Sequence, residues 1–317
     1  MVKKALLLLL LAVPLAGYSQ NKFNFRFWED SLIRLRDRVM TVYDETEKMA
    51  LNEDFMSLLE SVLLEPNSFK FEWDSVANFS VIASPDKTFK IYTWYLLKNN
   101  LSVENFGFLQ VYNDSRKKYV IYPLYDKRTH LDYAEEMIGD HNTWYGAVYY
   151  KIIPLKAKAK TYYTLLGWNG NNLFTNQKVI EVLHFKKDMT PVFGARIFKK
   201  YPKKVSRVIL DYHKDASLSL KYEKQSYDVS TGKRDQKTRK VIYETVVTDM
   251  IIFDHLIPME DHMESIPAFT VPESSMQQGF IPHEGNWLFQ KEVNGRNPDI
   301  TTPQPQAKRR TYYTPPN

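Results

Sequence analysis

Residues 108–122 have the sequence FLQVYNDSRKKYVIY. Aromatic and β-branched residues dominate both ends of this stretch, and the turn-forming residues Asn113-Asp114-Ser115 lie between them. Two runs of this kind on either side of a turn are typical of an antiparallel β-hairpin. We therefore predict two paired strands here, in a sheet that continues along the chain.

The same pattern recurs on both sides of this hairpin. Pro85-Asp86-Lys87 predicts a turn before a strand at residues 89–94, and the segment GWNGNN at residues 167–172 predicts a second dense turn. Aromatic residues make up 14% of the chain, which also favours strands. We find no repeat of about 40–50 residues, as a propeller would require. The fold class predicted is mainly β, an antiparallel sandwich or curved β-meander.

A helical pattern precedes the strands. Over residues 23–65 apolar side chains recur every three or four positions, which predicts amphipathic helices that pack on the sheet. Asn52 is the expected cap of a second helix, which Pro66 would end. Further along, residues 131–138 are expected to form a short helix, residues 230–235 an exposed loop, and residues 257–286 irregular structure.

The N-terminus has the pattern of an export signal. Lys3 and Lys4 precede an apolar run at residues 5–15, and Gly17 and Ser19 are small residues suited to cleavage before Gln20. The run is shorter than the roughly 20 residues of a membrane span. Because the chain has no cysteine, disulfides, a lipid-modified cysteine and cysteine-bound zinc are excluded. We expect an exported chain, periplasmic or outer-membrane-associated, with no transmembrane span after cleavage.

These patterns divide the chain into four expected parts. They are a signal peptide at residues 1–19, a helical N-terminal region at 20–68, a β-rich domain at 69–293 and a disordered, Pro-rich basic tail at 294–317.

Charge is distributed unevenly along the β-rich part. Residues 186–240 contain 16 Lys and Arg against 6 Asp and Glu. Such an excess attracts anionic partners, although lysines at sheet edges also serve solubility. For an exported chain we expect an envelope protein or anionic envelope component as the partner, and no nucleic acid. The candidate basic surface consists of Lys199, Lys200, Lys203 and Lys204, together with Lys233, Arg234, Lys237, Arg239 and Lys240.

Candidate chemistry is sparse. There is no G-x-S-x-G elbow, P-loop or G-x-G-x-x-G motif, and we therefore predict neither catalytic residues nor a cofactor. Trp94, Trp144 and Trp168 are candidate platforms for sugar stacking, with burial in the sheet as the alternative. Asp254, His255 and His262 carry oxygen and nitrogen ligands suited to a metal ion, but without a recognised ligand spacing.

Two segments carry a resemblance to known proteins. YYTLLGWNGN at residues 162–171 and MIIFDHLIP at residues 250–258 resemble segments of an uncharacterised family of exported Bacteroidota proteins. The Ser19-Gln20 junction also resembles signal peptides of that phylum, and the similarity covers about residues 75–293. The resemblance implies export and supplies no activity. Ser31 and Ser75 lie in Asp-Ser-apolar triplets similar to the O-glycosylation motif of such proteins.

Taken together, these features favour an exported cell-envelope protein that acts as a non-enzymatic binding or interaction module. The alternative is a carbohydrate-active enzyme or a glycan-binding protein. An enzyme of that class would have a cleft with two carboxylates about 5–10 Å apart. A binding module would instead present a flat aromatic or basic face.

Overall fold

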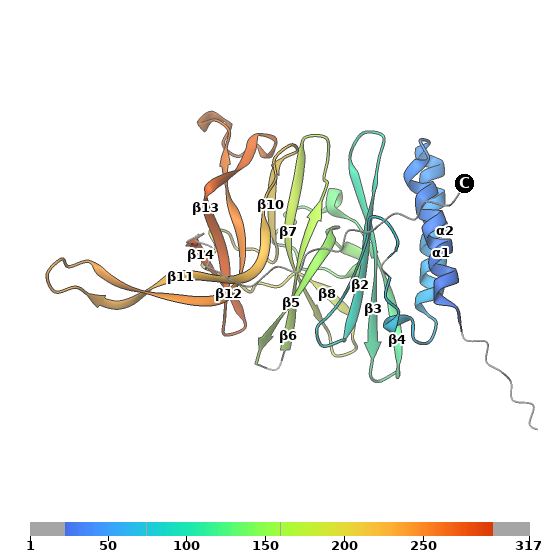
Figure 1. Cartoon of the computed structure of the whole chain (residues 1–317), viewed down its shortest axis with the longest axis horizontal. Helices are drawn as coiled ribbons and strands as arrows, with labels where there is room; N and C mark the ends of the chain where they lie inside the picture. Colours follow the sequence, from blue (N-terminus) through green and yellow to red (C-terminus); the bar gives the residue numbers. More distant parts are fainter. Residues whose placement is uncertain (1–22, 74, 159, 294–317) are drawn as a thin grey trace, which may run out of the picture.

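The computed structural model describes residues 23–73, 75–158 and 160–293. Over these residues two helices and three β-sheets are stacked side by side along the long axis of the molecule (Figure 1). The layers follow the order of the chain, from the helix pair to the sheet that carries β13. The prediction of a mainly β, antiparallel fold with an N-terminal helical segment is confirmed. The predicted signal peptide and tail lie outside the described residues.

The helix pair consists of α1 (Phe25–Thr41) and α2 (Glu45–Leu63). The side chain of Asp44 accepts a hydrogen bond from the Glu47 amide at 2.8 Å and so caps α2. Two helices were predicted in this region, but the expected cap at Asn52 is wrong. Asn52 is buried inside α2, where its side-chain oxygen accepts a hydrogen bond from Trp94 Nε1 at 2.8 Å. Neither helix, nor any other helix in the described part of the chain, is long and apolar enough to cross a membrane.

The first sheet contains the predicted hairpin. Its strands are antiparallel and follow the chain in order: β1 (Phe79–Ala83), β2 (Phe89–Leu97), β3 (Val103–Asn113) and β4 (Lys118–Tyr125). Alternate residues of β2 point to opposite faces. Tyr92 and Trp94 pack against the helices, whereas Phe89 and Ile91 pack against the second sheet. Both faces of this sheet are therefore covered.

The second sheet lies at the centre of the stack. Its strand order is β10-β7-β6-β5, and β8 also pairs with β7; the bounds are β5 (Val148–Ala157), β6 (Lys160–Asn169), β7 (Thr175–Phe185), β8 (Pro191–Phe193) and β10 (Val208–His213). In β7, Val179 and Leu183 face the first sheet while Ile180 and Val182 face the third. Burial on both faces explains why residues 179–183 of β7 form a nearly continuous apolar run.

The third sheet has the order β11-β12-β13-β14-β9. The strands are β9 (Phe198–Lys199), β11 (Leu220–Arg234), β12 (Val241–Pro258), β13 (Thr270–His283) and β14 (Asn286–Val293), and β9 pairs in parallel with β14. The prediction of irregular structure over residues 257–286 is therefore wrong. The polar run ESSMQQ at residues 273–278 hid β13 from the apolar pattern.

The strands β11 and β12 continue beyond this sheet as a two-stranded arm, which projects from the body in Figure 1. We define the arm as residues 226–247. All of its side chains are exposed or half-buried, whereas Gln225 at its base is buried. The loop expected at residues 230–235 is in fact mostly strand, since β11 runs to Arg234.

Candidate functional site

The two halves of the predicted basic surface lie in different places. Lys199 ends β9, which forms one edge of the third sheet, and Lys200, Lys203 and Lys204 follow it. The second cluster lies at the far end of the arm, which grows from β11 and β12 at the opposite edge. The fold therefore does not unite the nine residues into one surface. We call them the body lysines (Lys199, Lys200, Lys203, Lys204) and the arm tip (Lys233, Arg234, Lys237, Arg239, Lys240).

The arm tip is organised by its one acidic residue. Asp235 Oδ1 accepts hydrogen bonds from the amides of Lys237 at 3.0 Å and Thr238 at 2.7 Å. These bonds lower the pKa of Asp235, and the bond from the Thr238 amide has the largest effect. None of the five basic side chains forms an ion pair with another described residue. Within the described residues the tip thus presents five exposed basic side chains against one acidic side chain.

The body lysines are partly engaged by their own chain. Lys203 Nζ lies 2.9 Å from Glu135 Oε2 in an ion pair. Lys199 Nζ donates a hydrogen bond to the Arg196 carbonyl at 3.1 Å. Of the two clusters, the arm tip is therefore the one with more charge available for a partner.

One face of the arm carries an apolar stripe of Tyr227, Val229, Ile242 and Val246 together with Glu244, while Tyr243 and Val247 lie on the other face. Tyr227 lies opposite Val246, and Val229 lies opposite Glu244. Because side chains alternate along a strand, Ile242 shares this face. Val229, Ile242 and Val246 are 37%, 41% and 36% exposed. Tyr227, at the base of the arm, packs against the cluster that contains Met250 and Ile252. Beyond it, an exposed apolar stripe of this kind is typical of a contact surface.

The three predicted tryptophan platforms have different positions. Trp94 and Trp144 are both 0% exposed, so neither ring has a face that a sugar could reach. Burial in the cores between layers makes the prediction wrong for these two. Trp168 is half-buried and contacts Tyr95 edge to face, with ring centroids 5.4 Å apart. It lines a cleft at the ends of the first and second sheets.

The predicted metal ligands do not form a site. Asp254 Oδ2 accepts from the Ser219 amide at 2.7 Å and Oδ1 accepts from Gln277 Nε2 at 3.2 Å. His262 is exposed in the β12–β13 connection, 3.4 Å from Glu260. Among residues 23–73, 75–158 and 160–293, no group of three or more His, Cys, Asp or Glu side chains is arranged to hold a metal ion. The metal prediction is therefore wrong.

A second cleft, of about 410 Å³, is lined by two aspartates, Asp211 and Asp254. Asp211 Oδ2 accepts from Gln177 Nε2 at 2.9 Å, and its Oδ1 is buried. Burial raises the pKa of this carboxyl. Since Asp211 is turned into the sheet and both oxygens of Asp254 are bonded to the chain, this cleft does not match the paired-carboxylate geometry of a glycosidase.

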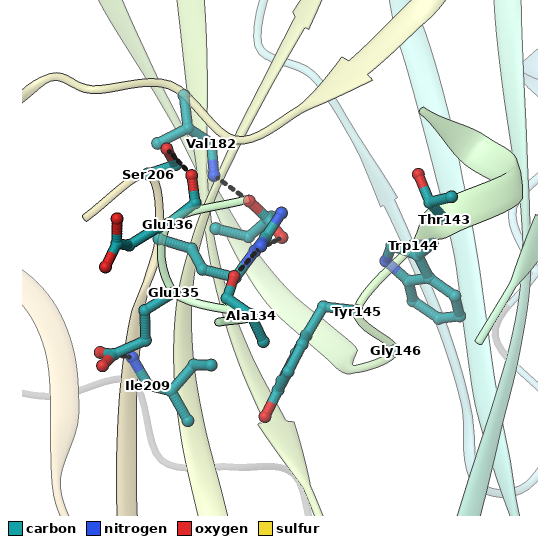
Figure 2. A network of polar contacts seen from close by, with 12 residues as sticks. Ala134, Glu135, Glu136, Thr143, Trp144, Tyr145, Gly146, Val182, Ser206 and Ile209 are labelled. Atoms are coloured by element: carbon teal, nitrogen blue, oxygen red, sulfur yellow. Dashed lines mark hydrogen bonds and ion pairs between the residues drawn. The ribbon is translucent and has the colours of Figure 1, made fainter. Parts of the chain in front are cut away.

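A buried ion pair that the sequence did not reveal lies between the first and second sheets. Arg207 Nε is 2.7 Å from Glu181 Oε2, and neither side chain is exposed. Arg207 Nη1 also donates to the Ala134 carbonyl, and the guanidinium lies over the Tyr145 ring at 5.8 Å. Figure 2 shows Ala134, Glu135 and Glu136 on one segment, with the Tyr145 ring nearby.

The structure of the segment that contains Glu135 and Glu136 differs from the prediction. Residues 131–138, expected to be a helix, form turns. Their polar groups bond to the chain before β10: the Glu135 carbonyl accepts from the Ser206 amide at 2.6 Å, and the Glu136 carbonyl accepts from Ser206 Oγ at 2.9 Å. The buried network therefore holds a loop in place.

The candidate modified serines lie in the N-terminal region. Ser31 is half-buried on α1, and its hydroxyl donates to the Phe27 carbonyl at 3.1 Å. Ser75 is exposed before β1. Modification of either serine stays a prediction.

Comparison with known proteins gives no relative from which a function could be transferred. No protein-family model, curated protein or solved structure matches the chain. The function is therefore argued from the arm and the clefts described above.

Proposed function

We propose that this chain is an exported, non-enzymatic interaction protein of the cell envelope, which binds an acidic protein through its arm. The observation that carries the proposal is the arm itself, which combines an exposed tip of net positive charge with an exposed apolar stripe. In this account the chain is periplasmic or associated with the outer membrane. The export-type N-terminal sequence, LLLLLLAVPLAGYSQ at residues 6–20, supports that location.

The positive charge of the arm tip favours a partner with negative charge. Five basic side chains and one acidic side chain lie at the arm tip, and all are exposed. Long-range attraction of this kind increases the rate of association with anionic surfaces and declines as salt increases. The partner is therefore expected to present a cluster of Asp and Glu.

The backbone of the arm favours a protein as that partner. β11 is the edge strand of the third sheet, and β12 pairs with β13 only from Ile251 onward. The outer edges of both arm strands therefore have no ladder partner among the described strands. An added strand from another chain would satisfy these groups, and its side chains would lie beside the apolar stripe.

Affinity capture of the tagged mature protein from fractionated envelopes tests the proposal. Wild type is expected to retain one envelope protein in a stoichiometric amount. Reversal of the arm tip (Lys233, Arg234, Lys237, Arg239 and Lys240, each to Glu) is expected to remove it, as is high salt. Reversal of the body lysines (Lys199, Lys200, Lys203 and Lys204, each to Glu) is the matched control and is expected to retain most of the binding.

Three results would contradict the proposal. The first is capture that is unchanged when a folded protein carries the reversed arm tip. The second is loss of capture with the reversed body lysines alone. The third is tip-dependent sedimentation with protein-free vesicles of anionic lipid, which would make a lipid surface the partner.

A further inference from the structure

A cleft of about 520 Å³ lies where the ends of the first and second sheets meet, away from the arm. Tyr95 from β2 and Trp168 from β6 form part of its wall. At its rim, Leu97, Leu101, Leu173 and Phe174 are 46%, 45%, 48% and 62% exposed. A mainly apolar cleft of this size is suited to a small molecule.

The exposed apolar rim is held in a defined conformation. The side-chain oxygen of Asn172 accepts hydrogen bonds from the Phe174 amide at 2.8 Å and the Thr175 amide at 3.1 Å. The Phe174 carbonyl accepts from the Lys214 amide at 2.9 Å. Across the cleft, Leu101 adopts a φ of +62°, a left-handed conformation that is uncommon for a bulky residue. Hydrogen bonds therefore define the conformation of the rim, which has a cost in backbone strain at Leu101 and in apolar exposure.

Arg128 connects two of the segments that border the cleft. Its Nη2 donates to the Val103 carbonyl at 2.6 Å, and its Nη1 donates to Asn169 Oδ1 and Asn171 Oδ1 at 2.7 and 2.8 Å. These bonds fasten the start of β3 to the turn after β6. A Cβ atom on Gly170 would lie 2.7 Å from Val103 Cγ2, so the fit between the two sheets is close here.

One cation lies in this apolar cleft. Lys214 Nζ donates to the Gly170 carbonyl and to Asn176 Oδ1, both at 3.1 Å. An ammonium group has three N–H donors, so one is left over. Within the described residues Lys214 has no carboxylate within ion-pair distance. Burial lowers the pKa of Lys214, and Asp215, an exposed carboxylate that also lines the cleft, acts in the opposite direction from beyond ion-pair distance. A half-buried cation whose direct hydrogen-bond partners are neutral is complementary to an anionic group.

We propose that this cleft binds a small amphipathic carboxylate, whose apolar chain or ring packs on Trp168 and the leucines while its carboxylate pairs with Lys214. The site is separate from the arm and does not depend on the proposed function.

Calorimetric titration of the full mature chain with octanoate and with 1-octanol tests this assignment. The two probes share an apolar chain and differ in charge. Wild type is expected to bind octanoate more tightly than octanol. Lys214→Met is expected to weaken octanoate binding about ten-fold and to leave octanol binding nearly unchanged, because it removes only a charge-assisted contact.

Two further variants separate binding from folding. Phe174→Ala, at an exposed rim position, is expected to weaken the binding of octanoate and of octanol by a similar factor of about three to ten. Lys151→Met removes an exposed lysine of β5 outside the cleft and is expected to change neither of the two affinities. Reversal of the arm tip is likewise expected to leave octanoate binding intact.

The proposal is overturned if wild type fails to bind octanoate up to its solubility limit. It is also overturned if Lys214→Met binds octanoate as wild type does. Preferential binding of an uncharged sugar such as maltose, lost in Trp168→Ala, would assign the cleft to a glycan instead.

Discussion

At the scale of the residue, the Glu181–Arg207 pair has a high desolvation cost because neither side chain is exposed. Burial raises the pKa of the Glu181 carboxyl, while Arg207 acts in the opposite direction. Arg207→Met would leave a buried carboxylate without its counter-charge and is expected to lower the free energy of unfolding by about 3–5 kcal/mol. Urea denaturation measures the change. The double variant Glu181→Leu/Arg207→Met is expected to recover most of the loss, since two apolar side chains replace the whole pair.

The exposed Lys203–Glu135 pair is the control for this prediction. Lys203→Met breaks an ion pair whose lysine is 67% exposed, so a loss of at most about 1 kcal/mol is expected. If Arg207→Met costs no more than Lys203→Met, the buried pair does not stabilise the loop in the way described.

A second residue-scale prediction concerns His184. Burial lowers the pKa of His184 from 6.5 to about 4, and the charge of Lys160 acts in the same direction. Between these values the unfolded chain binds more protons than the folded chain, so stability present above pH 6.5 is lost as the pH falls towards about 4. His184→Gln is expected to lose less stability over this interval than wild type does.

Urea denaturation at pH 6.5 and at pH 4 tests the effect of His184. The exposed His262→Gln is the matched control and should lose as much stability as wild type. Equal losses in His184→Gln and wild type would show that His184 does not contribute to the acid sensitivity.

At the scale of the element, the start of α2 depends on Asp44. Asp44→Ala removes the side-chain acceptor of the Glu47 amide and is expected to cost about 1 kcal/mol. Asp54→Ala changes an exposed aspartate within the same helix and should stay within about 0.5 kcal/mol of wild type. Thermal unfolding of the two variants measures both changes in stability. A larger loss from Asp54→Ala would contradict the assigned cap.

This helix also shows how far local patterns predict the fold. Apolar spacing correctly predicted helices over residues 23–65, but Asn52-Glu53-Asp54 imitates a helix start. Only the buried contact between Asn52 and Trp94, which are distant in sequence, shows that Asn52 belongs inside the helix. The hairpin at residues 108–122 was predictable because turn and strands are adjacent in the chain.

The candidate sites were less predictable for a related reason. Composition revealed the basic residues of 186–240, but their separation depends on β9 and β11 lying at opposite edges of one sheet. The apolar cleft combines residues 95–103, 168–174 and 213–215, which no local pattern connects. Glu181 and Arg207 lie in otherwise apolar segments and become partners only when β7 and β10 pair.

At the scale of the whole molecule, the stack separates a stable body from the arm. The central sheet is covered on both faces, and Trp287 Nε1 of the third sheet donates to Thr164 Oγ1 of the central sheet at 2.7 Å. Beyond Tyr227, which packs against the third sheet at the base of the arm, the arm takes no part in these layers. Replacement of residues 226–247 by Asn-Gly is therefore expected to change the melting temperature little.

Calorimetry of the arm-deleted chain measures this prediction and establishes whether that variant is folded for binding experiments. A fall in melting temperature as large as that from a core truncation would show that the arm supports the body. Such a result would contradict the distinction between a stable body and an arm that does not stabilise it, on which the proposed function rests.

The central claim is that the arm contacts an acidic envelope protein, and site-specific photo-crosslinking in cells tests it most directly. A photoreactive residue is placed at Tyr243 on the arm and, as the control, at Tyr133 on the body, which are 60% and 83% exposed. The account predicts one dominant crosslinked protein from Tyr243, lost when the arm tip is reversed, and none of that product from Tyr133. No product from Tyr243, or the same product from both positions, would contradict it.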